Sequence, residues 1–426
     1  MEGKTRGQVL PVLKDIQLAG KRVFLRVDFN VPISPGAQIS DDTRIVAALP
    51  TIRYCLEQKA KLIIASHLGR PQGTVQEKYS LMPVAQYLSE LLQQDILFTD
   101  ALSHEAVRKL TLDLRESHII FLENLRFHPG EESNNPEYSR RLASYADVYV
   151  NDAFGTMHRA HASTVGILDY VEQCAVGFLV EKELKYLSQL NENPPRPFVA
   201  VIGGAKVSDK IAVLENLIKK VDVLLLGGAM AYTFLKAQGL KVGHSLVEEN
   251  KLHLAERILE RARLNQVRLL LPKDHVVAQE LKSNAPSRET LGTEISGEWM
   301  GLDIGPKTIA MFQEEIRAAK TVLWNGPLGA FEYPPFDRGT RSIAQCLSEV
   351  DGMTIVGGGD SVAAIKQAGL ADQVSHLSTG GGATLEFLEG KQLPGLQALE
   401  KRYKKHLEEV RIQEQNRFEQ EEDEEK

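Results

Sequence analysis

The sequence has little cysteine, no excess of basic charge and no long apolar run. Its three cysteines, Cys55, Cys174 and Cys346, show no C-x-x-C spacing. Neither a disulfide framework nor a thiolate zinc site is therefore expected, and a reducing cytoplasm fits best. The formal net charge is −7, which argues against nucleic acid and against an anionic membrane surface as partners. The longest apolar stretch, 223–235, is shorter than the ~20 residues of a membrane span.

Several familiar chemical motifs are also missing. Residues 1–15 lack the apolar region of a signal peptide. The GKT at 3–5 has no upstream glycine or strand, so it is not a P-loop, and no G-x-G-x-x-G follows a predicted strand. His158 and His161 have no further candidate ligand, which argues against a metal site there. No Ser-His-Asp or Cys-His arrangement stands out, and Cys174 and Cys346 are expected in the core.

The sequence does contain short apolar runs that alternate with helical patterns. The runs are rich in valine, isoleucine and leucine, as strands buried on both faces are. Alternation of strands and helices predicts parallel α/β sheets. The expected strands are 22–27, 61–66, 118–122, 147–150, 198–202, 222–226, 267–271, 321–324 and 353–356, and the expected helices include 80–94 and 208–221.

A breaker cluster at 191–197, preceded by a helical pattern at 180–190, divides the chain into two halves. We therefore predict an α/β fold with two doubly wound parallel-sheet domains joined by a helix and hinge. Residues 398–420 are helical in pattern, and the acidic residues at the end are expected to form a solvated tail. The predicted parts are 1–179, the connecting helix and hinge 180–197, 198–392, the C-terminal segment 393–413 and the acidic tail 414–426.

Ligands of open parallel sheets bind outside the carboxyl ends of the strands, so the residues just after each apolar run are informative. In the first half these positions hold at least four arginines. Arginine binds phosphate and carboxylate through its planar guanidinium, which predicts a pocket for a small, multiply anionic substrate. The alternative is that each arginine is a surface ion-pair residue. The polar residues of these loops are Asp28, Asn30, Arg44, His67, Arg70, Arg126, His128, Asn151, Asp152 and Arg159.

The loops of the second half carry glycine clusters instead. Glycine allows close approach of the backbone to a ligand, and amides at a following helix N-terminus bind phosphate, which predicts a nucleotide site. The alternative is that the glycines only make tight strand-to-helix turns. The clusters are GGAK (203–206), GGAM (227–230), NGPLGAFE (325–332), GGGD (357–360) and TGGGA (379–383).

Three charged residues accompany these glycines. Asp360 could bind Mg²⁺ that also contacts the nucleotide phosphates, or it could cap the next helix. Lys206 and Lys210 lie near the start of a helix expected from about Ser208. Cations are unfavourable at that end of a helix, so a phosphate-binding role is the better interpretation.

The most distinctive segments, in chain order, are RVDFNVP (26–32), SHLGRP (66–71), FLENLRFHPGEE (121–132), NDAFGTMHRAHAS (151–163), GFLVEKEL (177–184), GGAKVSDKI (203–211), NGPLGAFE (325–332), GGGDS (357–361) and STGGGATLEFLEGKQLPG (378–395). Taken together, these segments identify the chain as similar to the phosphoglycerate kinase family from about Leu18 to Leu399. The resemblance implies reversible phosphoryl transfer from 1,3-bisphosphoglycerate to ADP, giving 3-phosphoglycerate and ATP, with Mg²⁺ bound to the nucleotide.

The resemblance also implies a role for each matching residue. Residues 1–179 would bind phosphoglycerate, 198–392 would bind the nucleotide, and 393–413 would return to the first domain. The phosphoglycerate pocket would contain Asp28, Asn30, Arg44, His67, Arg70, Arg126 and Arg159. The nucleotide would contact Lys206, Lys210, Gly227, Gly228, Gly305, Glu332, Gly358, Gly359, Asp360 and Ser361, with Asp360 on the magnesium and Glu332 on the ribose hydroxyls.

The donor is an activated acyl phosphate, so no covalent enzyme intermediate is needed, and the protein must position both substrates and neutralise charge. Arg44, Lys206 and the amides of Gly380, Gly381 and Gly382 are the expected catalytic groups. With the substrates on separate halves, we expect an active site in the cleft between the domains and hinge closure that excludes water.

Three positions depart from the usual family pattern. Ser361 stands in place of threonine, Val180 stands in place of methionine, and the chain beyond about Leu399 has no counterpart. A kinase of another small carboxylic acid and a non-catalytic scaffold remain as alternatives. We expect a cytoplasmic monomer, and the sequence does not distinguish glycolysis from the Calvin cycle as its pathway.

Overall fold

The computed structural model describes residues 10–34, 36–99 and 103–424. The chain divides into two compact units. Unit 1 comprises Met1–Leu184 and Gln392–Lys426, and unit 2 comprises Lys185–Lys391. Helix α5 (Phe178–Glu192) passes from one unit to the other.

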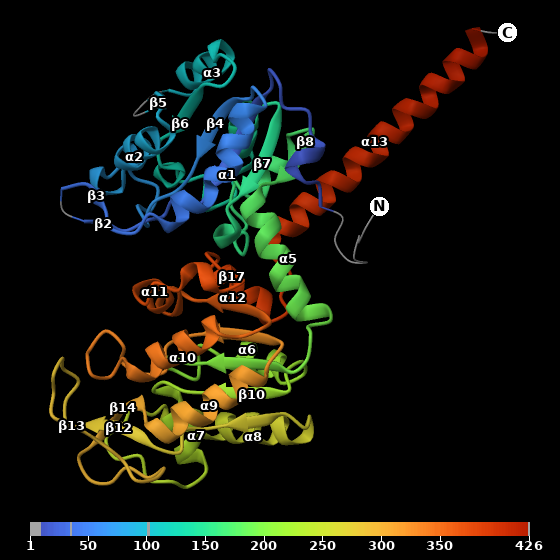
Figure 1. The fold of residues 1–426 in the computed structure, drawn as a ribbon. Coiled ribbons are helices and arrows are strands. Elements are labelled where there is room, and N and C mark those ends of the chain that lie inside the picture. Colours follow the sequence, from blue (N-terminus) through green and yellow to red (C-terminus); the bar gives the residue numbers. More distant parts are fainter. Residues whose placement is uncertain (1–9, 35, 100–102, 425–426) are drawn as a thin grey trace. The chain divides into compact units, whose positions relative to one another are not determined.

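Unit 1 is built on one parallel six-stranded sheet in the order β5-β6-β4-β1-β7-β8. Helix α1 lies against one face of this sheet (Figure 1). The central strands β1, β4, β6 and β7 are buried on both faces, which explains their largely apolar sequences. The elements are β1 (Arg22–Val27), the hairpin β2 (Ile33–Ser34) and β3 (Gln38–Ile39), α1 (Thr43–Glu57), β4 (Lys61–Ala65), α2 (Met82–Leu92), β5 (Ile96–Thr99), α3 (His104–Asp113), β6 (Ile119–Leu122), α4 (Pro136–Ala143), β7 (Val148–Asp152), β8 (Gln173–Val176) and α13 (Pro394–Glu424).

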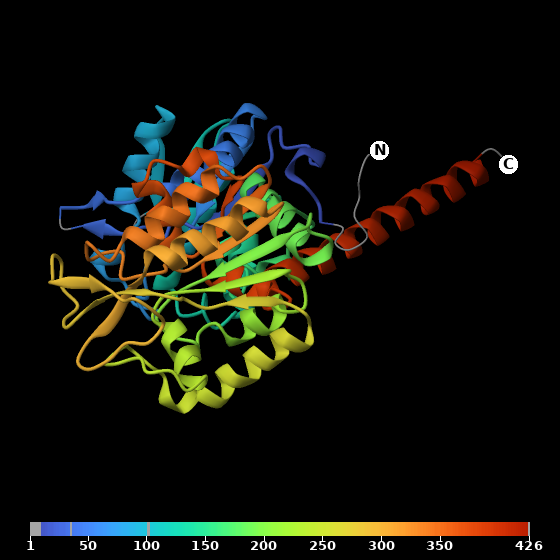
Figure 2. The ribbon, with the colours of Figure 1, turned by 60° about the horizontal axis from the view of Figure 1, so that its bottom comes forward.

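Unit 2 has a second parallel six-stranded sheet, in the order β11-β10-β9-β15-β16-β17. In Figure 2 its strands lie between the yellow-green helices α7 and α8 on one face and the orange helices α9 and α10 on the other. A small antiparallel sheet, β13-β12-β14, is added to it. The elements are β9 (Phe198–Ile202), α6 (Ile211–Leu217), β10 (Val223–Leu226), α7 (Met230–Ala237), α8 (Leu252–Leu264), β11 (Arg268–Leu270), β12 (His275–Ala278), β13 (Ser287–Glu289), β14 (Met300–Ile304), α9 (Pro306–Ala318), β15 (Thr321–Asn325), α10 (Arg338–Ser348), β16 (Met353–Gly357), α11 (Gly359–Gln367), β17 (His376–Leu377) and α12 (Gly382–Leu388).

The prediction of two parallel α/β domains is confirmed, and each of the nine apolar runs contains a strand. The expected start of a helix near Ser208 is wrong, because α6 begins at Ile211. The Glu248 carboxylate accepts hydrogen bonds from the Ser208 amide and hydroxyl at 2.9 and 2.6 Å, which holds Ser208 in the preceding loop. All three cysteines are free and buried. No helix in the described part of the chain is long and apolar enough to cross a membrane.

The boundary expected at 413/414 does not coincide with the end of a structural element. One helix, α13, runs from Pro394 to Glu424. Its first turns pack on unit 1, where Gly395 N–H donates to the Met157 carbonyl at 2.9 Å and Arg402 donates to the Glu172 carbonyl at 2.9 Å. Both views show the outer part of α13 extending away from the rest of unit 1 (Figures 1 and 2). Residues 411–417 are exposed.

Deletion of residues 414–426 is expected to leave the turnover number and the melting temperature nearly unchanged. The described side chains of this segment are exposed, and it is too acidic and too poor in apolar groups to add to a core. Thermal unfolding and steady-state kinetics of the shortened chain test this. A fall of several degrees in the melting temperature would show that the segment contributes to the stability of the folded chain.

Candidate functional site

The polar loops of unit 1 meet at one edge of its sheet. Asp28 follows β1, His67 follows β4, and Arg126 follows β6. Arg159 lies in the loop after β7. These four strands are neighbours in the order β6-β4-β1-β7 and run parallel, so their carboxyl ends lie together. The structure therefore brings residues far apart in the sequence to one place.

Four of the predicted residues form a direct contact group. Arg44 Nη1 donates to the Asn30 carbonyl at 2.8 Å and lies 3.4 Å from the Asp28 carboxylate. His67 Nδ1 is 3.8 Å from Asp28 Oδ1. Arg44 is the second residue of α1, where the helix dipole disfavours a cation, so its placement indicates an anionic ligand or partner. Asp28 supplies that partner in this structure and fixes the direction of the guanidinium.

Backbone contacts connect the remaining loops to this group. The Asn30 side chain accepts a hydrogen bond from the Gly69 amide at 2.9 Å, and Arg126 donates to the Gly69 carbonyl at 2.8 Å. Gly69 has φ +61°, and a Cβ there would lie 2.3 Å from the Tyr79 ring, so glycine is required. Arg70 follows Gly69 and is exposed, as is Arg159. These two side chains are accessible to a ligand.

The positive charge of this site comes from arginine and not from histidine. Burial, together with Arg26, Arg126 and Arg44, holds the pKa of His67 well below its ordinary value. Burial and Arg126 likewise lower the pKa of His161 to about 3. Both imidazoles are therefore neutral near pH 7, where they offer hydrogen bonds without charge.

Sequence reasoning assigned no role to Arg26, which is fully buried at the end of β1. It donates to Ser163 Oγ at 2.8 Å and lies 3.3 Å from His67 Nδ1. Ser163 donates through its hydroxyl to the buried Glu131 carboxylate at 2.6 Å. The sequence signal was a charged residue inside an otherwise apolar strand. This buried network supports the loops that carry His67 and Arg159.

Two other polar residues at a strand end point inward. The Asn151 side chain accepts a hydrogen bond from the Ala153 amide at 2.9 Å. Asp152 is fully buried and accepts from the Leu179 and Val180 amides at 2.9 and 3.2 Å. These amides begin α5, so Asp152 caps that helix. Both residues serve the local structure.

Burial raises the pKa of Asp152 to about 6. A raised pKa means that the folded chain binds the proton more tightly, so this carboxyl contributes less stability as pH rises from about 4 to 6. We expect Asp152→Asn to remove that dependence. As pH rises over this range, the free energy of unfolding of the variant should therefore increase relative to that of the parent by up to roughly 3 kcal/mol. Chemical denaturation at several pH values measures the difference. A difference that does not change between pH 4 and 7 would contradict the assignment.

The glycine turns of unit 2 gather at the carboxyl edge of its sheet. They follow β9, β10, β15 and β16, which are adjacent strands. The turns also contact one another, since a Cβ on Gly228 (φ +68°) would lie 2.6 Å from the Gly204 backbone, and one on Gly326 would lie 2.2 Å from the Gly203 carbonyl. A Cβ on Gly227 would lie 2.4 Å from Leu328. Part of the glycine content is therefore required by packing between the turns.

Two glycines have no such packing explanation. A Cβ on Gly359 or on Gly381 would meet nothing within 4 Å. Gly381 has φ +52°, which accounts for its identity, but Gly359 has an ordinary φ. Gly359 begins α11, whose first amides have no partner within the helix. Open space above a glycine at a helix N-terminus fits the close approach of a phosphate.

Asp360 and Ser361 follow Gly359, and their side chains differ in burial. Asp360 is exposed, whereas Ser361 is fully buried and its hydroxyl accepts a hydrogen bond from the Gly326 amide at 2.6 Å. The described residues contain no cluster of three or more His, Cys, Asp or Glu that could hold a metal ion alone. A single exposed carboxylate beside a phosphate-binding turn fits Mg²⁺ that is bound mainly through nucleotide oxygens and water.

The two predicted lysines differ in their surroundings. Lys206 is exposed on the turn after β9. Lys210 is half-buried at the N-cap of α6, and its ammonium group donates to Asn325 Oδ1. Burial lowers the pKa of Lys210, and the nearby Asp209 and Asp360 oppose that shift. The buried amide nitrogen of Asn325 has no hydrogen-bond partner among the described residues. Lys210 and Asn325 are thus oriented together at the end of β15.

The remaining predicted residues lie at other turns of unit 2. A Cβ on Gly305 would lie 2.4 Å from the Asp274 carboxyl carbon, and Asp274 accepts from the Lys307 and Thr308 amides at the start of α9. Glu332 is exposed, on the loop whose Ala330 amide donates to the Leu302 carbonyl at 2.8 Å. Gly380, Gly381 and Gly382 lie directly at the N-terminus of α12.

Comparison with known proteins gives one family throughout. The family model described as phosphoglycerate kinase matches residues 13–391. A phosphoglycerate kinase from Anaeromyxobacter dehalogenans is 56% identical to this chain, and the match covers 92% of this chain and 99% of that relative. A phosphoglycerate kinase from Acidobacterium capsulatum is also 56% identical, and the match covers 91% of this chain and 98% of that relative.

Solved structures agree with the sequence relatives. The phosphoglycerate kinase structure from Coxiella burnetii is 43% identical with a TM-score of 0.84, covering 92% of this chain and 100% of its own. The structure from Pyrococcus horikoshii is 33% identical with a TM-score of 0.81, and the match covers 93% of this chain and 100% of that chain. The chain therefore belongs to the phosphoglycerate kinase family, whose members are phosphotransferases with a carboxyl group as acceptor.

Proposed function

We propose that the chain transfers a phosphoryl group reversibly from 1,3-bisphosphoglycerate to ADP, giving 3-phosphoglycerate and ATP. The observation that carries the proposal is the separation of two kinds of strand-end loop. Arginines gather at the carboxyl edge of the unit 1 sheet, whereas glycine turns with one exposed carboxylate gather at that edge in unit 2. A small polyanion and a nucleotide are the ligands that these two chemistries fit.

Unit 1 would bind the phosphoglycerate. Arg70 and Arg159 are exposed and can form paired hydrogen bonds with a phosphate or carboxylate. Arg126 is fixed by the Gly69 carbonyl and His67 is neutral, so they would orient the ligand. Asp28 and Asn30 hold Arg44. In this role Asp28 is a positioning residue.

Unit 2 would bind the nucleotide. The first amides of α11, from Gly359 to Ser361, would contact phosphate oxygens, with Gly358 making the turn before them. Lys206 and Lys210 would add positive charge, Gly227, Gly228 and Gly305 would allow close approach, and Glu332 would accept hydrogen bonds from the ribose. Asp360 would bind the Mg²⁺ that accompanies the nucleotide, and that ion would neutralise phosphate charge.

Transfer requires both substrates to meet, so we propose that the units close on each other when both are bound. Arg44 and Lys206 would then reach the transferring phosphoryl group and neutralise the charge on its equatorial oxygens. The amides of Gly380, Gly381 and Gly382, at the start of α12, would add hydrogen bonds. Closure would also exclude water, which would otherwise hydrolyse the acyl phosphate.

The finer assignments follow from the same proposal. Residues 180–197, which contain most of α5, would act as the hinge, and residues 393–413 would belong functionally to the phosphoglycerate-binding domain. We propose that the enzyme acts as a cytoplasmic monomer, which the buried, unpaired cysteines suit. Because the transfer is reversible, the same site could serve glycolysis or the Calvin cycle.

A coupled assay of ATP-dependent phosphorylation tests the proposal. We expect turnover with 3-phosphoglycerate in the presence of magnesium, and at least a hundredfold less with acetate or 2-phosphoglycerate, which do not present the same two anionic ends at the same spacing. Removal of magnesium should abolish the rate. Comparable turnover with acetate would identify a different acid kinase, and no turnover by the folded chain would support a non-catalytic role.

A further inference from the structure

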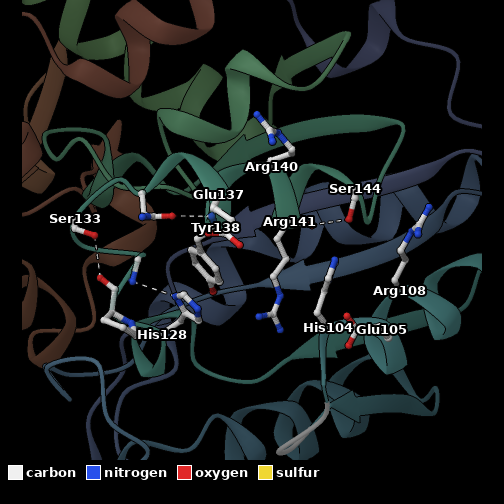
Figure 3. A pocket seen from close by; sticks show the side chains of 13 residues that line it. His104, Glu105, Arg108, His128, Ser133, Glu137, Tyr138, Arg140, Arg141 and Ser144 are labelled. Atoms are coloured by element: carbon white, nitrogen blue, oxygen red, sulfur yellow. Dashed lines mark hydrogen bonds between the residues drawn. The ribbon is translucent and has the colours of Figure 1, made fainter.

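Two adjoining cavities lie in unit 1 beside α3 and α4. Figure 3 shows the residues that line the larger of these two. One has a volume of about 720 Å³ and is lined mainly by charged and polar side chains. The other has a volume of about 540 Å³ and is lined largely by apolar ones. They share His128, Tyr138 and Arg141. None of the residues proposed for phosphoglycerate binding lines either cavity.

The apolar cavity presents side chains that a hydrocarbon body could contact. Val75 lies at its rim with 76% of its surface exposed. Tyr138 stacks on the His128 ring, with centroids 4.0 Å apart and an angle of 3° between the planes, and so forms a flat wall. Pockets with apolar walls and a few polar groups are typical of small-molecule sites. The apolar side chains of the lining are Val75, Val107, Leu122, Leu125, Phe127 and Leu142.

The charged cavity is lined by both cationic and anionic side chains. Arg108, Arg140 and Arg141 line it together with Glu105 and Glu137. Burial lowers the pKa of both His104 and His128, so neither imidazole adds charge near pH 7. Among the residues that the structure describes, none of the three arginines forms an ion pair. Arg140 is directed away from the cavity, toward the Tyr170 ring. The attraction for an anion therefore rests on Arg141, whose guanidinium forms no ion pair with the described residues.

Arg141 lies where the two cavities meet. Its Nε donates to the Tyr145 hydroxyl at 3.1 Å, and that hydroxyl is 2.9 Å from His104 Nδ1, which fixes the direction of the guanidinium. Figure 3 shows Arg141 reaching into the space between His128 and His104. Arg140 points away, and its guanidinium lies 5.1 Å from the centre of the Tyr170 ring. The terminal nitrogens of Arg141 have no hydrogen bond to any residue in the described ranges and remain available to a ligand.

We propose that this double cavity binds an apolar carboxylate, a molecule in which one carboxylate is joined to an aromatic or branched hydrocarbon body. The guanidinium of Arg141 binds the carboxylate, and the apolar cavity holds the body. A second negative charge on the ligand is disfavoured by Glu105 and Glu137. The site is therefore distinct in chemistry from the polyanion site at the strand ends.

Titration of the full chain with 2-naphthoate, followed by ligand fluorescence and saturation-transfer NMR, tests the proposal. Saturating 3-phosphoglycerate and Mg-ADP, which do not react with each other, keep the catalytic sites filled. We expect saturable binding of one molecule per chain. Acetate and 2-naphthylmethanol should each bind at least tenfold more weakly, because each lacks one half of the recognised structure.

Two variants locate the site. Arg141→Gln should weaken 2-naphthoate about tenfold or more, the range for a lost hydrogen bond to a charged group. Val75→Glu, at an exposed position, should weaken it by placing a negative charge at the rim without affecting folding. Lys109→Gln is the control, because Lys109 is an exposed cation on α3, whose residues Glu105 and Arg108 line the cavity, and does not line the cavity itself. The proposal would be overturned if 2-naphthoate shows no saturable binding, or if acetate or 2-naphthylmethanol binds as tightly as 2-naphthoate. Unchanged affinity for 2-naphthoate in both variants would also overturn it.

Discussion

Arg44→Ala is expected to lower kcat by about 10³-fold, the scale seen when an arginine that stabilises phosphoryl transfer is lost. The guanidinium is held by the Asn30 carbonyl and the Asp28 carboxylate, so it is oriented before substrate binds. A group that acts mainly in the transition state affects turnover more than ground-state affinity. Nucleotide affinity should stay within a few-fold, because Arg44 belongs to unit 1 and the proposed nucleotide residues belong to unit 2.

Arg44→Lys is the informative companion variant. Lysine keeps the charge but loses the planar fork, so only part of the rate should return. Folding should be intact in both variants, because a partly exposed ion pair such as Arg44–Asp28 contributes only about 1 kcal/mol or less. The measurements are kcat and KM for both substrates, with circular dichroism as a check on folding. A folded alanine variant with near-normal kcat and a raised KM for 3-phosphoglycerate would make Arg44 a ground-state binding residue.

Asp360→Asn is expected to weaken the use of the magnesium nucleotide at least tenfold while 3-phosphoglycerate affinity stays nearly unchanged. Asparagine keeps the size of the side chain but removes the negative charge that a hard cation prefers. Asp360 is exposed, so the change should not disturb the fold. Magnesium titrations of the rate and calorimetric binding of Mg-ADP measure the effect.

Asp372→Asn provides a matched control on an exposed carboxylate of the same unit. It should change neither the magnesium dependence nor the nucleotide affinity. Equal loss of nucleotide and phosphoglycerate binding in Asp360→Asn would indicate misfolding or a capping role for this residue. Unchanged magnesium dependence would mean that the ion is held elsewhere.

The sequence was most informative where strands are buried on both faces. Short apolar runs such as 22–27 and 198–202, bounded by polar or glycine-rich loops, predict a buried strand. Their positions were therefore predicted closely. The edge strand β5 and the short strand β8 were missed. The alternating exposure of β5, which includes Leu97 at 47% exposed, weakens the apolar signal. The antiparallel strands β12 to β14 were missed because pairing between them depends on contacts distant in sequence.

The candidate sites were predicted in part. Residues directly after strands, such as Asp28 and His67, could be placed because parallel strands end at one edge. Arg26 could not, because its role depends on Ser163 and Glu131, which are more than 100 residues further along the chain. The start of α6 was misplaced for the same reason, since Glu248 determines the conformation of Ser208.

The most direct test of the two-site account is a cross-titration of two exposed positions, one in each unit. Dissociation constants for 3-phosphoglycerate and for Mg-ADP are measured by calorimetry on the parent, Arg70→Ala and Glu332→Ala. We predict that Arg70→Ala weakens the binding of 3-phosphoglycerate about tenfold or more and leaves the affinity for Mg-ADP unchanged. Glu332→Ala should weaken the binding of Mg-ADP by a similar factor and leave the affinity for 3-phosphoglycerate unchanged. If either variant weakens both ligands equally, or if each weakens the ligand assigned to the other unit, the division of the substrates between the units is wrong.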